Sequence, residues 1–130
     1  MTVPGTIAHS TIAHITSAAE WQAALSTGSY MTPRLQTQGF IPCSAFSADQ
    51  LLAVADVLYA GQAGLVVLLI DPGRRTHEVR YEDTESPGQF FPHVYGPLDL
   101  EAVTAVLDFP PRPDGTFRLP DFGAISPTAP

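Results

Sequence analysis

The feature of this chain that most restricts its fold is an unbroken apolar run, Leu65-Val66-Val67-Leu68-Leu69-Ile70, which is closed by Asp71-Pro72-Gly73. A strand that is apolar at every position is buried on both faces, and Asp-Pro-Gly is typical of a turn. The run is also far shorter than the roughly 20 residues that a membrane-spanning helix needs. We therefore predict a central strand over residues 65–70, with the rest of the chain packed around it.

The segment before this strand predicts a strand and two helices. Residues 11–15 are rich in β-branched side chains and are followed by Ser17 and Glu20, which have the spacing of a capping box. A helix is expected to begin there and to end at Gly28. Its buried face is predicted to comprise Trp21, Ala24 and Leu25.

Residues 32–44 contain Pro33, Gly39 and Pro42, so we expect an irregular extended segment with a strand-like centre at residues 39–41. Ser47 and Gln50 repeat the capping-box spacing, which predicts a second helix that ends near Gly61. The apolar stripe of this helix comprises Leu51, Val54, Ala55 and Leu58.

The polar and apolar alternation of residues 78–82 predicts a half-exposed neighbour of the central strand, within a β-hairpin. Residues 89–95 are aromatic and extended, and residues 100–107 predict a helical turn followed by a final strand. From residue 109 onward six prolines disfavour regular structure, so we predict a proline-rich tail over residues 109–130. Its apolar side chains Phe117, Leu119 and Phe122 are candidates for docking on the body.

Length and charge restrict the class of protein further. A chain of 130 residues has the size of one ordinary domain. Thirteen acidic residues against six arginines and no lysine give a formal charge of -7, which disfavours nucleic acid and anionic membranes as general partners. The single cysteine, Cys43, has no intramolecular disulfide partner, and the first residues lack a secretory signal pattern, so we expect a cytoplasmic protein.

Several short motifs occur in the order typical of one bacterial family. They are Ile12-Ala13-His14-Ile15-Thr16, Glu20-Trp21, Gly28-Ser29-Tyr30, Gly39-Phe40-Ile41-Pro42-Cys43-Ser44 and Phe91-Pro92-His93-Val94-Tyr95-Gly96-Pro97-Leu98. Over about residues 11–108 the chain resembles the domain-of-unknown-function family 952. That family is grouped with the ADP-ribosyltransferase-like superfamily, whose members bind NAD.

This resemblance implies an α+β fold in which two small, mostly antiparallel sheets form a cleft, with two or three helices. It places a single ADP-ribosyltransferase-like domain at residues 1–108. Its first signature implies that His14 holds the ADP-ribose side of NAD. In the second signature the family has His where this chain has Pro42, and proline is neither an acid, a base nor a hydrogen-bond donor.

The site residues expected from the resemblance fall into two groups. The catalytic candidates are His93 and Tyr95, although no acidic residue matches the glutamate that many active transferases use. The candidates for binding NAD or another ADP-ribose-containing nucleotide are His14, Thr16, Arg34 and Ser44.

Simpler roles stand beside these expectations. His14 also fits a buried core histidine, and Phe91, His93 and Tyr95 share one face of a strand at period two. Cys43 is expected to be a small buried apolar residue, since no basic group lies beside it in the sequence. No pair of residues has a recognised metal-ligand spacing, so we expect no metal.

The resulting function hypotheses are two. The first is a nucleotide-binding protein with weak or lost transferase activity, whose reaction would be NAD-dependent ADP-ribosyl transfer or NAD glycohydrolysis. The second is a non-catalytic binding or interaction module that keeps the fold. A cleft where His14, Ser44 and Tyr95 converge would favour the first hypothesis.

Overall fold

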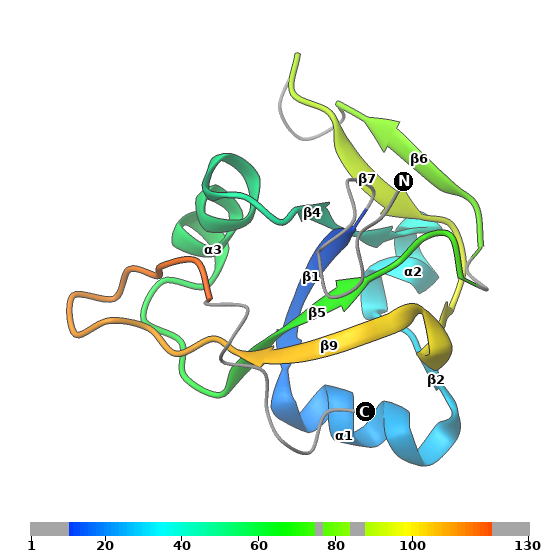
Figure 1. The fold of residues 1–130 in the computed structure, drawn as a ribbon, viewed down its shortest axis with the longest axis horizontal. Coiled ribbons are helices and arrows are strands. Elements are labelled where there is room, and N and C mark those ends of the chain that lie inside the picture. The colour runs from blue at the N-terminus through cyan, green and yellow to red at the C-terminus, as the bar shows by residue number, and fades with distance from the viewer. Residues whose placement is uncertain (1–10, 75–76, 84–87, 121–130) are drawn as a thin grey trace, which may run out of the picture.

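The computed structural model describes residues 11–74, 77–83 and 88–120, with the side chains of residues 33, 34 and 48 left out. Its largest element is a four-stranded antiparallel sheet in the order β4-β1-β5-β9 (Figure 1). The two inner strands are β1 (Ile12–Ser17) and β5 (Leu65–Ile70), and the edges are β4 (Ser44–Ala45) and β9 (Val103–Asp108). Every residue of β5 is buried, as its unbroken apolar sequence predicts.

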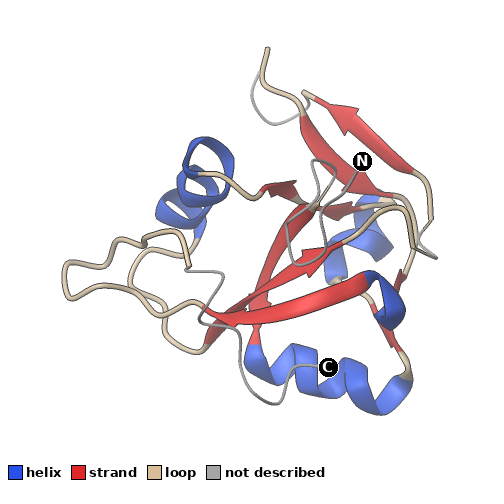
Figure 2. Ribbon diagram, in the orientation of Figure 1, coloured by secondary structure: helices blue, strands red, loops and turns tan. Residues whose placement is uncertain are grey.

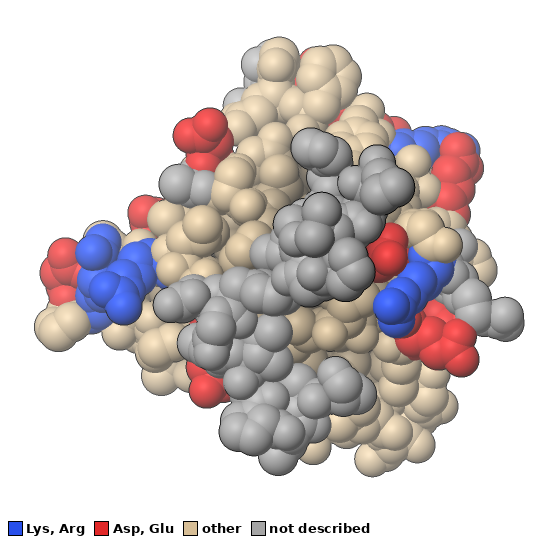
Figure 3. Space-filling view, in the orientation of Figure 1, with Lys and Arg blue, Asp and Glu red and all other residues tan. Residues whose placement is uncertain are grey.

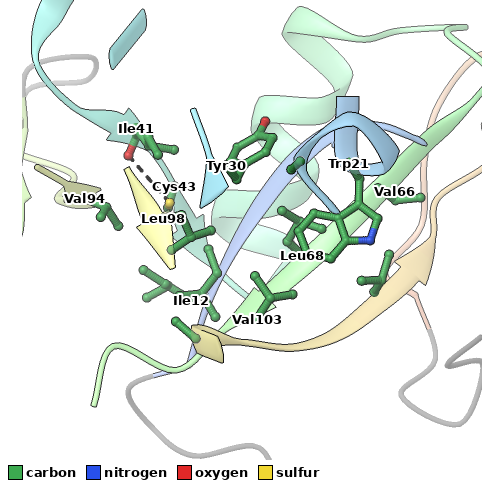
Figure 4. Close-up of a cluster of buried hydrophobic side chains, with 14 residues drawn as sticks. Ile12, Trp21, Tyr30, Ile41, Cys43, Val66, Leu68, Val94, Leu98 and Val103 are labelled. Carbon is green, nitrogen blue, oxygen red and sulfur yellow. Dashed lines mark hydrogen bonds between the residues drawn. The ribbon is translucent and has the colours of Figure 1, made fainter. Parts of the chain in front are cut away.

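Both faces of this sheet carry a hydrophobic core. On one face Val66, Leu68 and Ile70 pack with Trp21 and with apolar side chains from other strands. Figure 4 shows Val66 and Leu68 beside Trp21 in this cluster. On the other face Val67 and Leu69 pack with Leu51, Ala55, Phe109 and Phe117. The alternation of β5 side chains between two cores explains why its sequence has no polar face.

Two smaller antiparallel sheets complete the strands. One has the order β3-β7-β6, from Ile41–Pro42, Phe91–Val94 and Val79–Glu82, and the other pairs β2 (Ser29–Tyr30) with β8 (Leu98–Asp99). The fold is therefore mixed α and β with three antiparallel sheets in the described residues, where we expected two. The predicted pairing of residues 78–82 with the central strand is wrong, because β1 and β9 occupy both edges of β5 and β6 pairs with β7.

Three α-helices lie around these strands within the described part of the chain (Figure 2). Helix α1 (Ala18–Thr27) begins where Ser17 Oγ accepts a 3.0 Å hydrogen bond from the Glu20 amide, and it ends at Gly28 with φ of 93°. Trp21 and Ala24 are buried as predicted, but Leu25 is 48% exposed, so the buried stripe is narrower than expected.

Helix α3 (Ala53–Leu58) follows a π-helical turn over Ala48–Leu52, and the predicted cap at Ser47 accepts a hydrogen bond from the Gln50 amide. Helix α2 (Pro33–Gln38) was not predicted. Its first residue is proline, which is favoured at the first helical position, and Thr32 caps it. Proline therefore begins a helix here, where we expected an irregular segment.

The chain after β8 forms a short 3-10 turn, Leu100–Ala102, and then β9, in agreement with the prediction. Beyond β9 residues 109–120 form neither helix nor strand, yet Phe109 and Phe117 are almost fully buried and stack at 4.7 Å between ring centroids. Phe122 lies outside the described residues. No helix found in the described ranges is long and apolar enough to cross a membrane.

Candidate functional site

A pocket of about 250 Å³ opens beside the part of β1 that β4 leaves uncovered. Strand β4 pairs only with Ile12 and Ala13, so no described strand lies beside the β1 edge after Ala13. The pocket is bounded by both larger sheets, because β1 and β4 come from one sheet and β3 and β7 come from the other. Its lining also includes side chains of α1, β2 and α3. Such a concave site with a few polar groups is typical of small-molecule binding.

Four of the six predicted site residues line this pocket: His14, Thr16, Ser44 and His93. Tyr95 follows β7 and is not part of the lining, so the expected convergence of His14, Ser44 and Tyr95 does not occur. Arg34 is the second residue of α2, and its side chain lies outside the description. Four of the predicted residues thus meet at one place, and Tyr95 is not among them.

His14 is held by two protein groups. Its Nδ1 lies 2.7 Å from the carbonyl oxygen of Pro42, and its Nε2 lies 2.9 Å from the hydroxyl of Tyr30. A carbonyl only accepts, so Nδ1 is the donor of the first bond. The neutral ring then accepts the hydroxyl hydrogen of Tyr30 at Nε2. Both nitrogens of His14 are therefore engaged within the protein, and the ring fixes β3 and β2 against β1.

A second polar group extends this arrangement toward α1. Thr16 Oγ1 donates to the Glu20 carboxylate at 2.7 Å, so the Glu20 side chain turns to Thr16 and does not close a reciprocal capping box. Burial raises the pKa of Tyr30 well above its usual value, which keeps its hydroxyl protonated as a donor. The polar side chains of the pocket wall formed by β1 and α1 are therefore hydrogen-bonded to other protein groups.

His93 is bound differently. Its Nδ1 lies 2.8 Å from Glu82 Oε1, and the Tyr95 hydroxyl donates to the same oxygen at 2.6 Å. These two hydrogen bonds, that from Tyr95 being the larger effect, lower the pKa of Glu82 below its usual range. The Phe40 ring stacks on the His93 imidazole at 4.2 Å between centroids. Glu82 therefore stays a carboxylate that orients a clamped imidazole.

Glu82 is the main residue that sequence analysis missed. It lies on β6 opposite Phe91 of β7, and this pairing places its side chain on the face that carries His93. The alternation of residues 78–82 already put Glu82 on a defined face of a strand. The sequence does not show which strand pairs with residues 78–82, and we expected them beside β5, whereas residues 79–82 pair with β7.

Pro42 and Cys43 occupy the β3 side of the pocket. Pro42 faces His93 across the strand pair, and the neighbouring pair is joined by a hydrogen bond from the Cys43 amide to the Pro92 carbonyl. Pro42 therefore sits at a position of the ladder where its missing N–H removes no bond to β7. The Cys43 thiol is buried in the core, and burial raises its pKa far above the usual value.

The charge of the pocket is low. Glu20 is the one residue with a formal charge among the lining residues that the structure describes, and no arginine is among them. On the face drawn in Figure 3 the arginines stand in separate groups beside acidic side chains. Arg74 and Arg80, for example, pair with Asp71 and Glu78. The described arginines thus form no basic surface around the pocket.

Comparison with known proteins gives a family and solved structures. Residues 15–106 match the family described as protein of unknown function (DUF952). The crystal structure of protein CC0527 from Caulobacter crescentus is similar with a TM-score of 0.74 and 32% sequence identity, covering 84% of this chain and 94% of that chain. Its solution NMR structure gives a TM-score of 0.70 at the same identity. No curated protein matches the chain.

Proposed function

Because the chain belongs to the DUF952 family, a group with no assigned activity, we propose its function from the chemistry of the pocket: it binds NAD or another ADP-ribose-containing nucleotide there. The observation that carries this proposal is the convergence of His14, Thr16, Ser44 and His93 in a cavity of about 250 Å³. An ADP-ribosyltransferase-like fold is part of the proposal. Its support is the position of the pocket between the four-stranded and the three-stranded sheet.

The pocket fits one part of such a nucleotide. Ligand sites for drug-sized molecules usually measure about 300–1,000 Å³, so this cavity, which is slightly smaller, takes a nucleoside-sized group and not a whole dinucleotide. Tyr30, Tyr59 and Phe91 line the pocket and offer aromatic surface to a flat base or a nicotinamide ring. Because the cavity is too small for the whole nucleotide, the diphosphate would lie outside, toward solvent.

Weak or lost turnover is the second part of the proposal. Pro42 stands where the resemblance to the family implies a histidine, and it supplies only its carbonyl, which is already bonded to His14. Any NAD-dependent ADP-ribosyl transfer or NAD glycohydrolysis would then depend on positioning of the ligand and on His93 with Glu82. Binding therefore has more support in this site than catalysis.

A non-catalytic interaction module is the alternative function. It is favoured by the exposed side chains of Val57 and Leu58 on α3, which are 79% and 58% accessible. Adjacent exposed apolar side chains of this size are found at contact surfaces. Under this alternative the pocket would bind none of the nucleotides.

Isothermal titration of the full chain with NAD, ADP-ribose and nicotinamide riboside tests the proposal. Ser44→Ala removes a buried hydroxyl from the pocket wall and is expected to weaken binding by roughly 3- to 10-fold, the effect of one hydrogen bond. Ser29→Ala, at an exposed position of β2, is the matched control and should bind like the wild type. Absence of binding up to millimolar concentrations of all three ligands would favour the interaction module.

A further inference from the structure

His93 is the one pocket histidine with an unused nitrogen. Its side chain is fully buried, and its Nε2 has no hydrogen-bond partner among the described residues. Buried polar atoms without partners are rare in folded proteins because each costs free energy. His93 lines the pocket, and Glu82 holds the other nitrogen of the ring. Nε2 is thus the ring atom of His93 that can form a hydrogen bond with a group bound in the pocket.

The hydrogen on the His93 ring is assigned by its neighbours. Glu82 Oε1 also accepts the hydroxyl hydrogen of Tyr95, so this carboxylate oxygen acts as an acceptor and not as a donor. The His93 Nδ1 beside it must then carry a hydrogen. In a neutral imidazole with Nδ1 protonated, Nε2 presents a lone pair.

The remaining lining restricts what can approach that lone pair. Glu20 is the one formally charged lining residue described, and the other polar lining groups belong to His14, Thr16, Thr32, Tyr30, Tyr59 and Ser44. An anionic group would enter beside the Glu20 carboxylate, which is unfavourable in a partly enclosed site. A neutral group with an O–H or N–H bond meets no such cost, and for a cationic group attraction to the Glu20 carboxylate offsets the cost of leaving water.

We propose that His93 Nε2 is the hydrogen-bond acceptor for the ligand, and that the pocket selects a neutral or cationic group bearing a hydroxyl or amide N–H. Glu82 is a positioning residue that fixes the tautomer, and Tyr95 and Phe40 hold the pair in place. This inference rests on the proposed function, since it assumes that the pocket binds a small molecule. For a nucleotide of the proposed class, the inference places a ribose or carboxamide group in the pocket and the diphosphate outside it.

The tautomer can be read without any ligand. Long-range ¹H–¹⁵N correlation spectra of the full chain labelled with ¹⁵N-histidine distinguish protonated from unprotonated ring nitrogens, and His93→Gln identifies the His93 signals. We expect Nδ1 protonated and Nε2 unprotonated near pH 7.5. A hydrogen on Nε2, in the other tautomer or in an imidazolium paired with Glu82, would overturn the proposal even if NAD binds.

Two variants then separate the two nitrogens. In His93→Asn the amide N–H takes the place of Nδ1 and can still donate to Glu82, but the acceptor at Nε2 is gone. In His93→Gln the amide oxygen reaches the place of Nε2, while the bond to Glu82 is lost. We expect nicotinamide riboside to bind at least 10-fold more weakly to the Asn variant and within about 3-fold of wild type to the Gln variant. Equal affinity of the Asn variant and wild type would refute the acceptor role.

The spectra also keep the two proposals apart. Nicotinamide, adenosine, nicotinamide riboside and NAD are titrated separately while the His93 Nε2 resonance is followed. If NAD does not bind but a smaller probe shifts Nε2, the nucleotide proposal fails and the acceptor role stands. If NAD binds and no probe shifts Nε2, the nucleotide proposal stands and the acceptor role is refuted. If no probe binds, both are refuted.

Discussion

Replacing His14 by Ala should destabilise the protein strongly, whatever the pocket binds. The imidazole joins the Pro42 carbonyl to the Tyr30 hydroxyl, and Tyr30 is only 2% exposed. Each buried polar group left without a partner costs about 1–3 kcal/mol, and Pro42 is less buried than Tyr30. We therefore expect a loss of about 3 kcal/mol in the free energy of unfolding. For a chain of this length that is a decrease in Tm of roughly 10 °C.

Urea denaturation of His14→Ala and the wild type measures this loss, and Tyr30→Phe serves as a variant that removes only one of the two hydrogen bonds. Tyr30→Phe removes one hydroxyl but leaves the bond from His14 to Pro42, so it should cost less, about 1–2 kcal/mol. The double variant should cost less than the sum of the two singles, because both remove the same hydrogen bond. A His14→Ala protein within about 1 kcal/mol of wild type would refute the structural role. A loss of ligand affinity in His14→Ala reports on the pocket only if the fraction of folded protein is measured in the same sample.

Four further outcomes follow from the structure. Native Cys43 should resist alkylation at pH 8 and react after unfolding in guanidinium, because burial raises its pKa. Gly28→Ala should cost about 1 kcal/mol in urea denaturation, since φ of 93° favours glycine. Phe117→Ala should cost about 3–5 kcal/mol in the same assay, whereas the partly exposed Leu119→Ala should cost less than 1. The pKa of Glu82 is lowered in the folded protein, so its stabilising effect is complete above the usual value of 4.5 and is lost as the pH falls through the lower folded pKa. Glu82→Gln should therefore lose less stability in acid than the wild type does. Urea midpoints measured between pH 7 and pH 3 test this.

The parts of the fold that sequence predicts are those fixed by local interactions. The cap at Ser17, the left-handed end at Gly28 and the doubly buried strand at residues 65–70 each depend on side chains within a few positions. Helix α2 was not predicted because Pro33, together with Gly39 and Pro42, is typical of an irregular segment. Proline also favours the first position of a helix, and that is its role here. Local signals therefore fix most elements but are ambiguous where one residue type has two uses.

The pairing of strands was harder to predict because it depends on which edges are already occupied. Residues 78–82 have the alternation of any half-exposed strand, and nothing in that pattern distinguishes β5 from β7 as the partner. That one pairing decides whether Glu82 lies beside His93. His93 and Tyr95 belong to the family motif, but the carboxylate that bonds to both of them comes from outside it.

The two pocket histidines show why residue type and neighbours in the sequence do not assign a role. Both are almost fully buried, and both lie on short strands among apolar residues. His14 has both nitrogens engaged by groups 16 and 28 residues away, which makes it a structural link between strands. His93 has one nitrogen engaged by Glu82 and the other without a described partner. A ligand can therefore bond to His93 without breaking an existing hydrogen bond, whereas at His14 it would have to replace one.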